Sequence, residues 1–149
     1  MVARELRISY ADTGIVLPFR GIIKTSSDIY RLLKSIYPYE EIAYREHFYA
    51  LYLASNNKFL GYKQISSGGI TSTVADVRVI LQGALLANAT TLVIAHNHPS
   101  GNLMPSVADI ELTKRVYKAA SIMDIRLIDH MIISEDGFYS FADENNLNF

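Results

Sequence analysis

The stretch that decides the fold is TLVIAHNHPSGNLMPSVAD, residues 91–109, in which an apolar run leads directly into a polar loop. Its first five residues, 91–95, are apolar and rich in β-branched side chains, which is typical of a central strand. The loop from His96 to Pro105 contains two prolines and a glycine, and a helical pattern begins at Ser106. In sheets covered by helices, binding sites gather at the carboxyl ends of strands, so we expect a site in this loop.

The segments before this stretch alternate between strand and helix patterns. Residues 46–55 are nearly continuous in apolar character, which predicts a strand buried on both faces, and GYKQIS, residues 61–66, predicts its neighbour. A helix is expected to start near Thr73, with Thr73 and Asp76 as a capping box, and to end near Asn88. The predicted buried stripe of this helix comprises Val74, Val77, Leu81, Ala84 and Leu85.

Two further patterns lie in the first forty residues. An alternation that predicts a short strand comprises Leu6, Ile8 and Tyr10. Pro18 places the apolar residues around it in an edge strand or a loop. A helix is then expected, capped by Ser26 or Ser27 and stopped by Pro38. Its apolar positions, at the helical spacing, are Ile29, Leu32, Leu33 and Ile36.

The remaining patterns complete the predicted fold. The helix that begins at Ser106 has one face lined by Ile110, Thr113, Tyr117 and Ala120. Residues 125–134 predict a long strand, and residues 136–141 predict a short strand after an Asp-Gly turn. The order strand–helix–strand–strand–helix–strand–helix–strand–strand indicates an α/β fold, with a mixed β-sheet flanked by helices.

Length and composition limit the classes of protein. The 149 residues, half of them apolar, suit one globular domain over residues 1–149. Lys and Arg together number 14 and Asp and Glu 15, and this balance argues against non-specific nucleic-acid binding while allowing a local basic patch. No apolar run approaches ~18 residues and no signal peptide is present, so we expect a cytoplasmic protein without a membrane span. Exposed strand edges would allow a dimer.

The absence of cysteine restricts the chemistry further. It excludes disulfides, cysteine-based zinc ribbons, thiol nucleophiles and zinc deaminases that need a cysteine pair. Any metal must therefore be held by His, Asp or Glu. His96 and His98, two residues apart at a strand end, project to the same side, and Asp109 lies in the first turn of the next helix. This set suits one Zn²⁺ per chain and leaves the fourth tetrahedral position for water, whose pKa the metal lowers to roughly 7.

Hydrolysis would also need a proton carrier and an oxyanion donor. Glu46, at the start of a buried strand, is the candidate general acid/base, although Glu40 and Glu41 lie nearby and a glutamate at a strand start is often only a surface charge. Ser106, one turn before Asp109, is the candidate stabiliser of the oxyanion. Ser106 and Asp109 also form the pattern of a helix capping box, which is the alternative interpretation of both residues.

Other polar residues are assigned structural roles. His130 is expected to be a packed strand histidine or a partner that supports a metal ligand, and Asp129 to orient a neighbour. His47 should face the opposite side of the strand from Glu46. A small basic cluster, interpreted as a solvated helix face rather than a phosphate site, comprises Lys114, Arg115 and Lys118.

The motif HNHPSG…PS…D, followed by LIDHMII, resembles the signature of the JAMM (JAB/MPN) metalloprotease superfamily, and within it the RadC family. REHF at residues 45–48 and LLANATTLVIAHNHPSG at residues 85–101 are also similar to RadC sequences, and the resemblance covers about residues 40–142. It implies a cytidine-deaminase-like three-layer sandwich. It also implies a zinc-dependent hydrolase that acts on an amide or isopeptide bond, with a peptide or isopeptide substrate.

Carried over to this chain, the resemblance makes the zinc ligands His96, His98 and Asp109. It makes Glu46 the general acid/base and Ser106 the transition-state stabiliser. RadC proteins are commonly labelled as DNA-repair proteins. Longer members carry an N-terminal helix-hairpin-helix region thought to contact DNA, for which 149 residues leave no space, and the usual proline before Arg78 is missing here.

Two alternatives to the zinc hydrolase remain open at this point. The first is a non-catalytic, metal-containing interaction module that docks to DNA repair or replication partners. The second is metal-assisted cleavage of a phosphodiester, which a single zinc, the near-neutral charge and the lack of an arginine clamp near the motif disfavour.

Overall fold

The computed structural model describes residues 9–17, 21–68 and 75–149. Its helices are α1 (Ser26–Ile36), α2 (Val77–Leu86) and α3 (Val107–Ile122), together with the short 3-10 helix η1 (Tyr39–Glu41). Its strands are β1 (His47–Leu53), β2 (Phe59–Ser67), β3 (Thr91–Asn97), β4 (Arg126–Ile133) and β5 (Phe138–Ser140). Within these described segments, none of the helices has the length and apolar character needed to cross a bilayer.

The five strands form one mixed sheet in the order β2-β1-β3-β4-β5. β1 runs antiparallel to both β2 and β3, β3 and β4 are parallel, and β5 is antiparallel to β4. A parallel pair needs a crossover connection, and α3 supplies it between β3 and β4. The predicted α/β fold with a mixed sheet is therefore confirmed.

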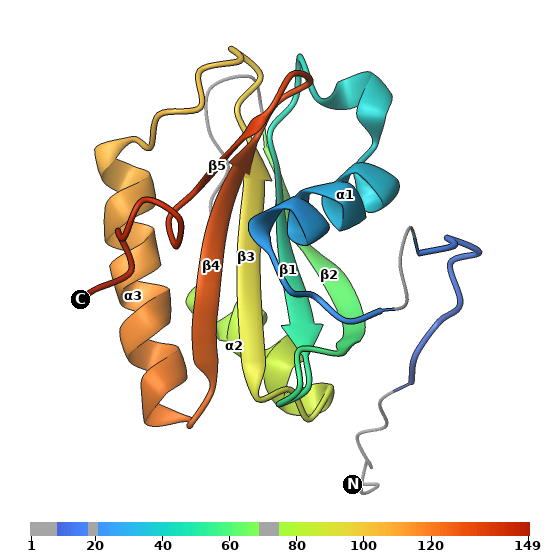
Figure 1. Ribbon diagram of the computed structural model, residues 1–149, viewed down its shortest axis with the longest axis vertical. Coiled ribbons are helices and arrows are strands. Elements are labelled where there is room, and N and C mark those ends of the chain that lie inside the picture. The colour runs from blue at the N-terminus through green and yellow to red at the C-terminus, as the bar shows by residue number, and fades with distance from the viewer. Residues whose placement is uncertain (1–8, 18–20, 69–74) are drawn as a thin grey trace, which may run out of the picture.

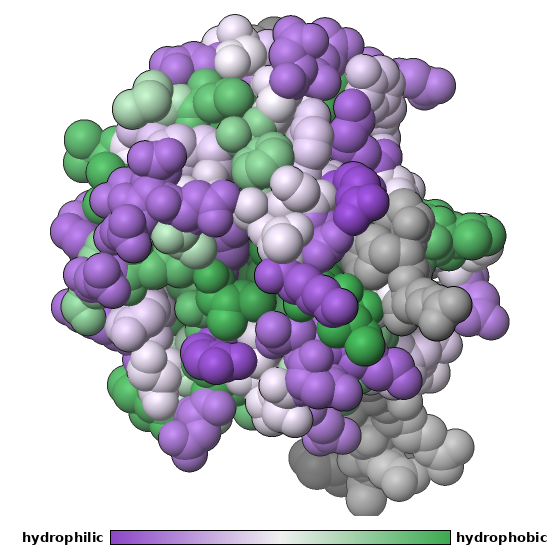
Figure 2. All heavy atoms as spheres, viewed as in Figure 1, coloured by the Kyte–Doolittle hydropathy of each residue, from purple (hydrophilic) through white to green (hydrophobic). Residues whose placement is uncertain are grey.

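Helices cover both faces of the sheet, as Figure 1 shows with α1 in front of the strands and α2 behind them. One core cluster joins α1 to one face through residues such as Leu32, Leu51 and Val93. A second cluster joins α2 and α3 to the other face through residues such as Ile80 and Ile94. The arrangement is the predicted three-layer sandwich, and most of the surface seen in Figure 2 is polar, with apolar patches between.

The central strands are buried along their whole length. Every residue of β1 and of β3 is buried, so the predictions of a doubly covered strand at residues 46–55 and of a central strand at residues 91–95 are confirmed. Successive side chains of a strand point to opposite faces. In β3, Leu92 and Ile94 consequently pack in the α2/α3 cluster, while Val93 packs in the α1 cluster.

The helix starts differ in detail from the predictions. α1 is capped by Thr25, in a capping box with Asp28, rather than by Ser26 or Ser27, because Thr25 is the last residue with extended backbone dihedrals. Asp76 is itself the N-cap of α2, and its side chain accepts a hydrogen bond from the backbone N–H of Arg78. It does not occupy the position that the sequence predicted, the third helical position of a capping box that starts at Thr73.

Some sequence predictions fall elsewhere. Leu6, Ile8, Pro18, Thr73 and Val74 lie outside the described residues. Tyr10 is not part of a strand. The predicted burial of Leu85 is wrong, because its side chain is 51% exposed. The predicted burial of Leu81 and Ala84 is confirmed, and Ile80 and Gly83 complete the buried face of α2. The Tyr52 ring lies against the helix at Gly83, where a Cβ would clash with it.

Asp129 on β4 has the structural role that was expected. Its carboxylate accepts hydrogen bonds from the Ser140 hydroxyl at 2.7 Å and from the Ala142 backbone N–H at 3.1 Å, which fastens the end of β5. The side chain is buried, and burial raises the pKa of Asp129 to about 6 from its ordinary 3.8. The folded protein therefore binds this proton more tightly than the unfolded chain does.

We expect Asp129 to contribute a fall of about 2 kcal/mol in the free energy of unfolding between pH 4 and pH 7, because it loses its proton over this range in the folded state. The variant Asp129→Asn mimics the neutral acid and should lack this fall. The fall is measured as the difference between wild type and variant, since buried His130, whose pKa is lowered, changes stability in the opposite direction in both proteins. Urea unfolding at the two pH values measures the difference. The exposed control Asp124→Asn should keep the wild-type pH dependence, and an unchanged dependence in Asp129→Asn would contradict the assignment.

Candidate metal centre

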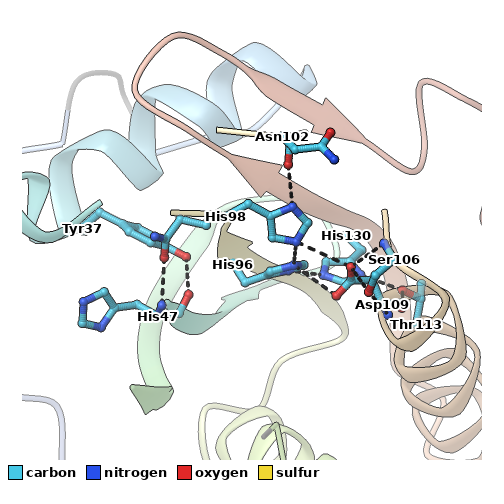
Figure 3. Close-up of polar contacts among 10 residues, drawn as sticks. Tyr37, His47, His96, His98, Asn102, Ser106, Asp109, Thr113 and His130 are labelled. Atoms are coloured by element: carbon cyan, nitrogen blue, oxygen red, sulfur yellow. Dashed lines mark hydrogen bonds and ion pairs between the residues drawn. The ribbon is translucent and has the colours of Figure 1, made fainter. Parts of the chain in front are cut away.

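The carboxyl end of β3 and the first turn of α3 meet at a cluster of His96, His98 and Asp109. One ligand atom from each of the three lies within 4.8 Å of the others. His96 is the penultimate residue of β3. His98 follows the strand and donates its backbone N–H to the carbonyl of Ile133 at 3.2 Å, which extends the pairing with β4. Figure 3 shows the three side chains pointing toward one another.

The Nε2 atoms of the two histidines face the carboxylate. His96 Nε2 lies 3.1 Å from Asp109 Oδ1, and His98 Nε2 lies 3.5 Å from Asp109 Oδ2. On the far side of its ring, His98 Nδ1 lies 2.6 Å from the carbonyl oxygen of Asn102. A carbonyl only accepts hydrogen bonds, so His98 carries a proton on Nδ1 and its Nε2 is the atom turned to the cluster.

These donors fit a divalent cation. The two Nε2 atoms are only 2.9 Å apart, so either a proton on one of them or a metal ion must offset the repulsion between their lone pairs. Burial raises the pKa of Asp109, but the two histidine rings that face its carboxylate outweigh burial and hold this pKa far below its usual range. The hydrogen bond to Asp109 likewise raises the pKa of His98. Two imidazoles and one carboxylate are a donor set that suits Zn²⁺.

Asp109 also caps α3. Its Oδ2 accepts the Ser106 backbone N–H at 2.7 Å and the Ser106 hydroxyl at 2.6 Å, while the Asp109 N–H donates to Ser106 Oγ at 3.2 Å. The capping box that the sequence offered as an alternative is therefore present. It coexists with the cluster because the cap uses Oδ2, which also lies 3.5 Å from His98 Nε2, and Oδ1 faces His96.

Glu46 lies directly before β1 and is half-buried. Its backbone carbonyl accepts the N–H of Gly68 at 2.9 Å, so the residue that follows β2 helps to hold the backbone of Glu46. The negative charge of Glu46 is one of the influences that raise the pKa of His98, after Asp109 and the Asn102 carbonyl. The residue predicted to move protons is thus electrostatically close to the cluster.

Asn97 is a residue that the sequence reasoning missed. It lies between the two histidines, is fully buried, and its amide Nδ2 donates to the carbonyls of Ile42 and Arg45, each at 2.8 Å. Its Oδ1 accepts the backbone N–H of His47 at 2.8 Å. Arg45 and His47 are the chain neighbours of Glu46, so Asn97 fastens the backbone on both sides of that residue. The signal for it was an amide between the two candidate histidine ligands, at the end of a buried strand.

The other polar residues have the positions expected of supporting groups. His47 is buried outside the cluster and contacts Glu41 at 2.7 Å and Gln64 at 2.9 Å. His130 is buried beside His96, and burial lowers its pKa well below the usual value. Lys114 is paired with Glu111 at 3.1 Å. Arg115 and Lys118 are exposed, as in a solvated helix face.

A mixed sheet between helix layers, with a His-x-His strand end facing an aspartate of the next helix, defines an α/β domain with a candidate metal centre. The family model described as RadC-like JAB domain matches residues 23–147. The chain belongs to this family, which confirms the resemblance seen in the sequence.

Relatives from several bacteria are similar to this chain. UPF0758 proteins of Flavobacterium johnsoniae and Porphyromonas gingivalis are 41% identical over 125 residues and 42% identical over 132 residues, which cover 82% and 88% of this chain. The UPF0758 protein YfjY of Escherichia coli is 40% identical over 103 residues, or 69% of this chain. The matched regions span 52%, 57% and 64% of the three relatives, so each of them is considerably longer.

Protein purified without a chelator should contain about one zinc per chain, and zinc should raise its unfolding temperature. His96→Ala and Asp109→Asn should abolish both effects, because the first removes a donor and the second removes the charge that offsets the cation. Elemental analysis and thermal unfolding measure them. Glu111→Ala, an exposed acid on the same helix, is the control and should bind zinc normally. Equal zinc content in all four proteins would contradict the site.

Asn97→Ala should lower the free energy of unfolding by at least about 2 kcal/mol, because it removes the partner of two buried backbone groups, the His47 N–H and the Ile42 carbonyl, and of the partly buried Arg45 carbonyl. Hydrogen exchange at residues 42–47 should accelerate beyond the change expected from global destabilisation. The exposed control Asn148→Ala should change stability by less than about 0.5 kcal/mol. Unchanged exchange in this segment would show that Asn97 does not hold it.

Proposed function

We propose that this chain is a zinc-dependent hydrolase of the JAMM type, which cleaves an amide or isopeptide bond by attack of water on the carbonyl carbon. The observation that carries the proposal is the convergence of His96, His98 and Asp109, and the influence of the Glu46 charge on His98 supports it. Three protein ligands leave a fourth tetrahedral position open, which distinguishes catalytic from structural zinc sites. Bound zinc supplies a lowered water pKa and a polarised carbonyl.

Glu46 is assigned the proton transfers. It takes a proton from the attacking water as the oxygen–carbon bond forms, and gives that proton to the departing nitrogen as the carbon–nitrogen bond breaks. Its half-buried position and its influence on His98 support this role. The hydrogen bonds of Asn97 to Arg45 and His47 support it as well, because a general base must be held in one place.

Ser106 is assigned the stabilisation of the oxyanion, and its hydroxyl must turn to do so. In the structure the hydroxyl donates to Asp109 Oδ2, and it has only one proton to give. When the hydroxyl rotates toward a substrate oxygen, the Ser106 backbone N–H still donates to Asp109 Oδ2 and preserves the start of α3. The same residue can therefore cap the helix in the resting protein and donate to the substrate during reaction.

The variant Glu46→Gln should keep its zinc but lose at least about 100-fold in hydrolysis, because the amide cannot carry the proton. Wild type and variant are incubated with a proteome-derived peptide library and with isopeptide-linked conjugates, and mass spectrometry counts new termini. Glu40→Gln is the matched exposed control and should behave as wild type.

Chelation should abolish cleavage by wild type, and zinc should restore it. If zinc-loaded wild type yields no more new termini than Glu46→Gln, the hydrolase proposal fails. The interaction module would be favoured by two results together. Deletion of the gene would lower survival after DNA damage, and a strain with Glu46→Gln would survive as well as wild type.

A further inference from the structure

A row of buried polar side chains lies behind His96, on the side away from the candidate metal position (Figure 3). His96 Nδ1 lies 2.9 Å from His130 Nε2 on β4. On the opposite side of that ring, His130 Nδ1 lies 2.6 Å from the Thr113 hydroxyl on α3. The Thr113 hydroxyl in turn lies 2.5 Å from the backbone carbonyl oxygen of Asp109. The row therefore starts at one candidate ligand and ends at the backbone of another.

The protons of this row can be assigned from its far end. A carbonyl oxygen has no proton, so the Thr113 hydroxyl donates to Asp109 O. That hydroxyl has no second proton, so toward His130 its oxygen can only accept. His130 consequently carries its proton on Nδ1 and donates it to Thr113.

The second nitrogen of His130, Nε2, then determines which nitrogen of His96 carries the proton. The His130 ring is fully buried and stacks on Phe141, with ring centres 4.8 Å apart, and also contacts Phe48. A ring in these surroundings is neutral and carries a single proton. Its Nε2 is therefore an acceptor, and His96 must donate from Nδ1. This leaves the lone pair of His96 on Nε2, the atom that faces His98 and Asp109.

We propose that Thr113 and His130 are positioning residues that fix His96 in the one tautomer able to bind a metal through Nε2. His98 reaches the same state more directly, because a backbone carbonyl accepts its Nδ1 proton. The partner of His96 Nδ1 is instead His130 Nε2, so the tautomer of His96 is set through the side chains of His130 and Thr113. If the row reversed, His130 would donate from Nε2 and the proton of His96 would occupy the position that the metal needs.

The inference rests on the candidate metal site but not on hydrolysis. Its test uses Thr113→Val, which keeps the shape of the side chain and removes the acceptor for His130 Nδ1. The reversed row then becomes favourable, since a buried N–H without an acceptor is destabilising. Thr113→Ser restores the hydroxyl. Thr91→Val, a buried threonine at the opposite end of β3, is the matched control.

Two measurements are made on each protein. Nitrogen-15 NMR of the histidine rings, with the metal removed, reports which nitrogen of His96 and of His130 is protonated. Competition with a chromophoric chelator gives the zinc dissociation constant. Wild type, Thr113→Ser and Thr91→Val should all show Nδ1–H on His130 and His96. Thr113→Val should show Nε2–H on both rings and bind zinc about 10- to 100-fold more weakly.

Three results would overturn the inference. The first is a wild-type protein whose His96 carries its proton on Nε2. The second is a Thr113→Val protein with unchanged tautomers and an unchanged zinc dissociation constant. The third is an equal loss of zinc affinity in Thr113→Ser and Thr113→Val, which would assign the effect to packing. Turnover enters neither measurement, so an inactive protein would refute the proposed hydrolase without affecting this result.

Discussion

The candidate site depends on holding three electron-donating side chains, those of His96, His98 and Asp109, close together. The Nε2 atoms of His96 and His98 lie 2.9 Å apart with the Asp109 carboxylate beside them, and electron-rich atoms at this distance repel one another unless a proton or a metal ion lies between them. A bound cation removes the repulsion, but the polypeptide must supply the geometry beforehand. Much of the surrounding polar structure, including the α3 capping box and the buried side chain of His130, contributes to that geometry.

β3 is the element that makes this arrangement possible. Because side chains alternate along a strand, His96 is directed toward the α2/α3 layer and Asn97 toward the opposite layer. One buried strand end thereby serves both parts of the candidate site. His96 meets Asp109 of α3, while Asn97 fastens the backbone around Glu46 before β1. β1 and β4 flank β3 on its two sides, so neither part can move without disturbing the centre of the sheet.

Local patterns in the sequence determined most of the fold and the identity of the candidate ligands. The apolar runs at residues 46–55 and 91–95 could be recognised as buried strands because continuous apolar character is a local property. The spacing from His96 to Asp109 could be recognised because it spans one strand end, one loop and one helix start. The boundaries of helices were less certain: Asp76 fits two positions of a cap equally well, and only the backbone dihedrals distinguish them.

The sequence by itself thus determined the three-layer sandwich and the set of His96, His98 and Asp109. Only the tertiary structure decided which groups support that set. Asn97 and Thr113 were not singled out for such roles, because their partners lie on segments distant in the chain and hydrogen-bond partners are fixed only when the layers pack. The proton positions on His96 and His130 are likewise a property of that packing, since each follows from the next acceptor in the row.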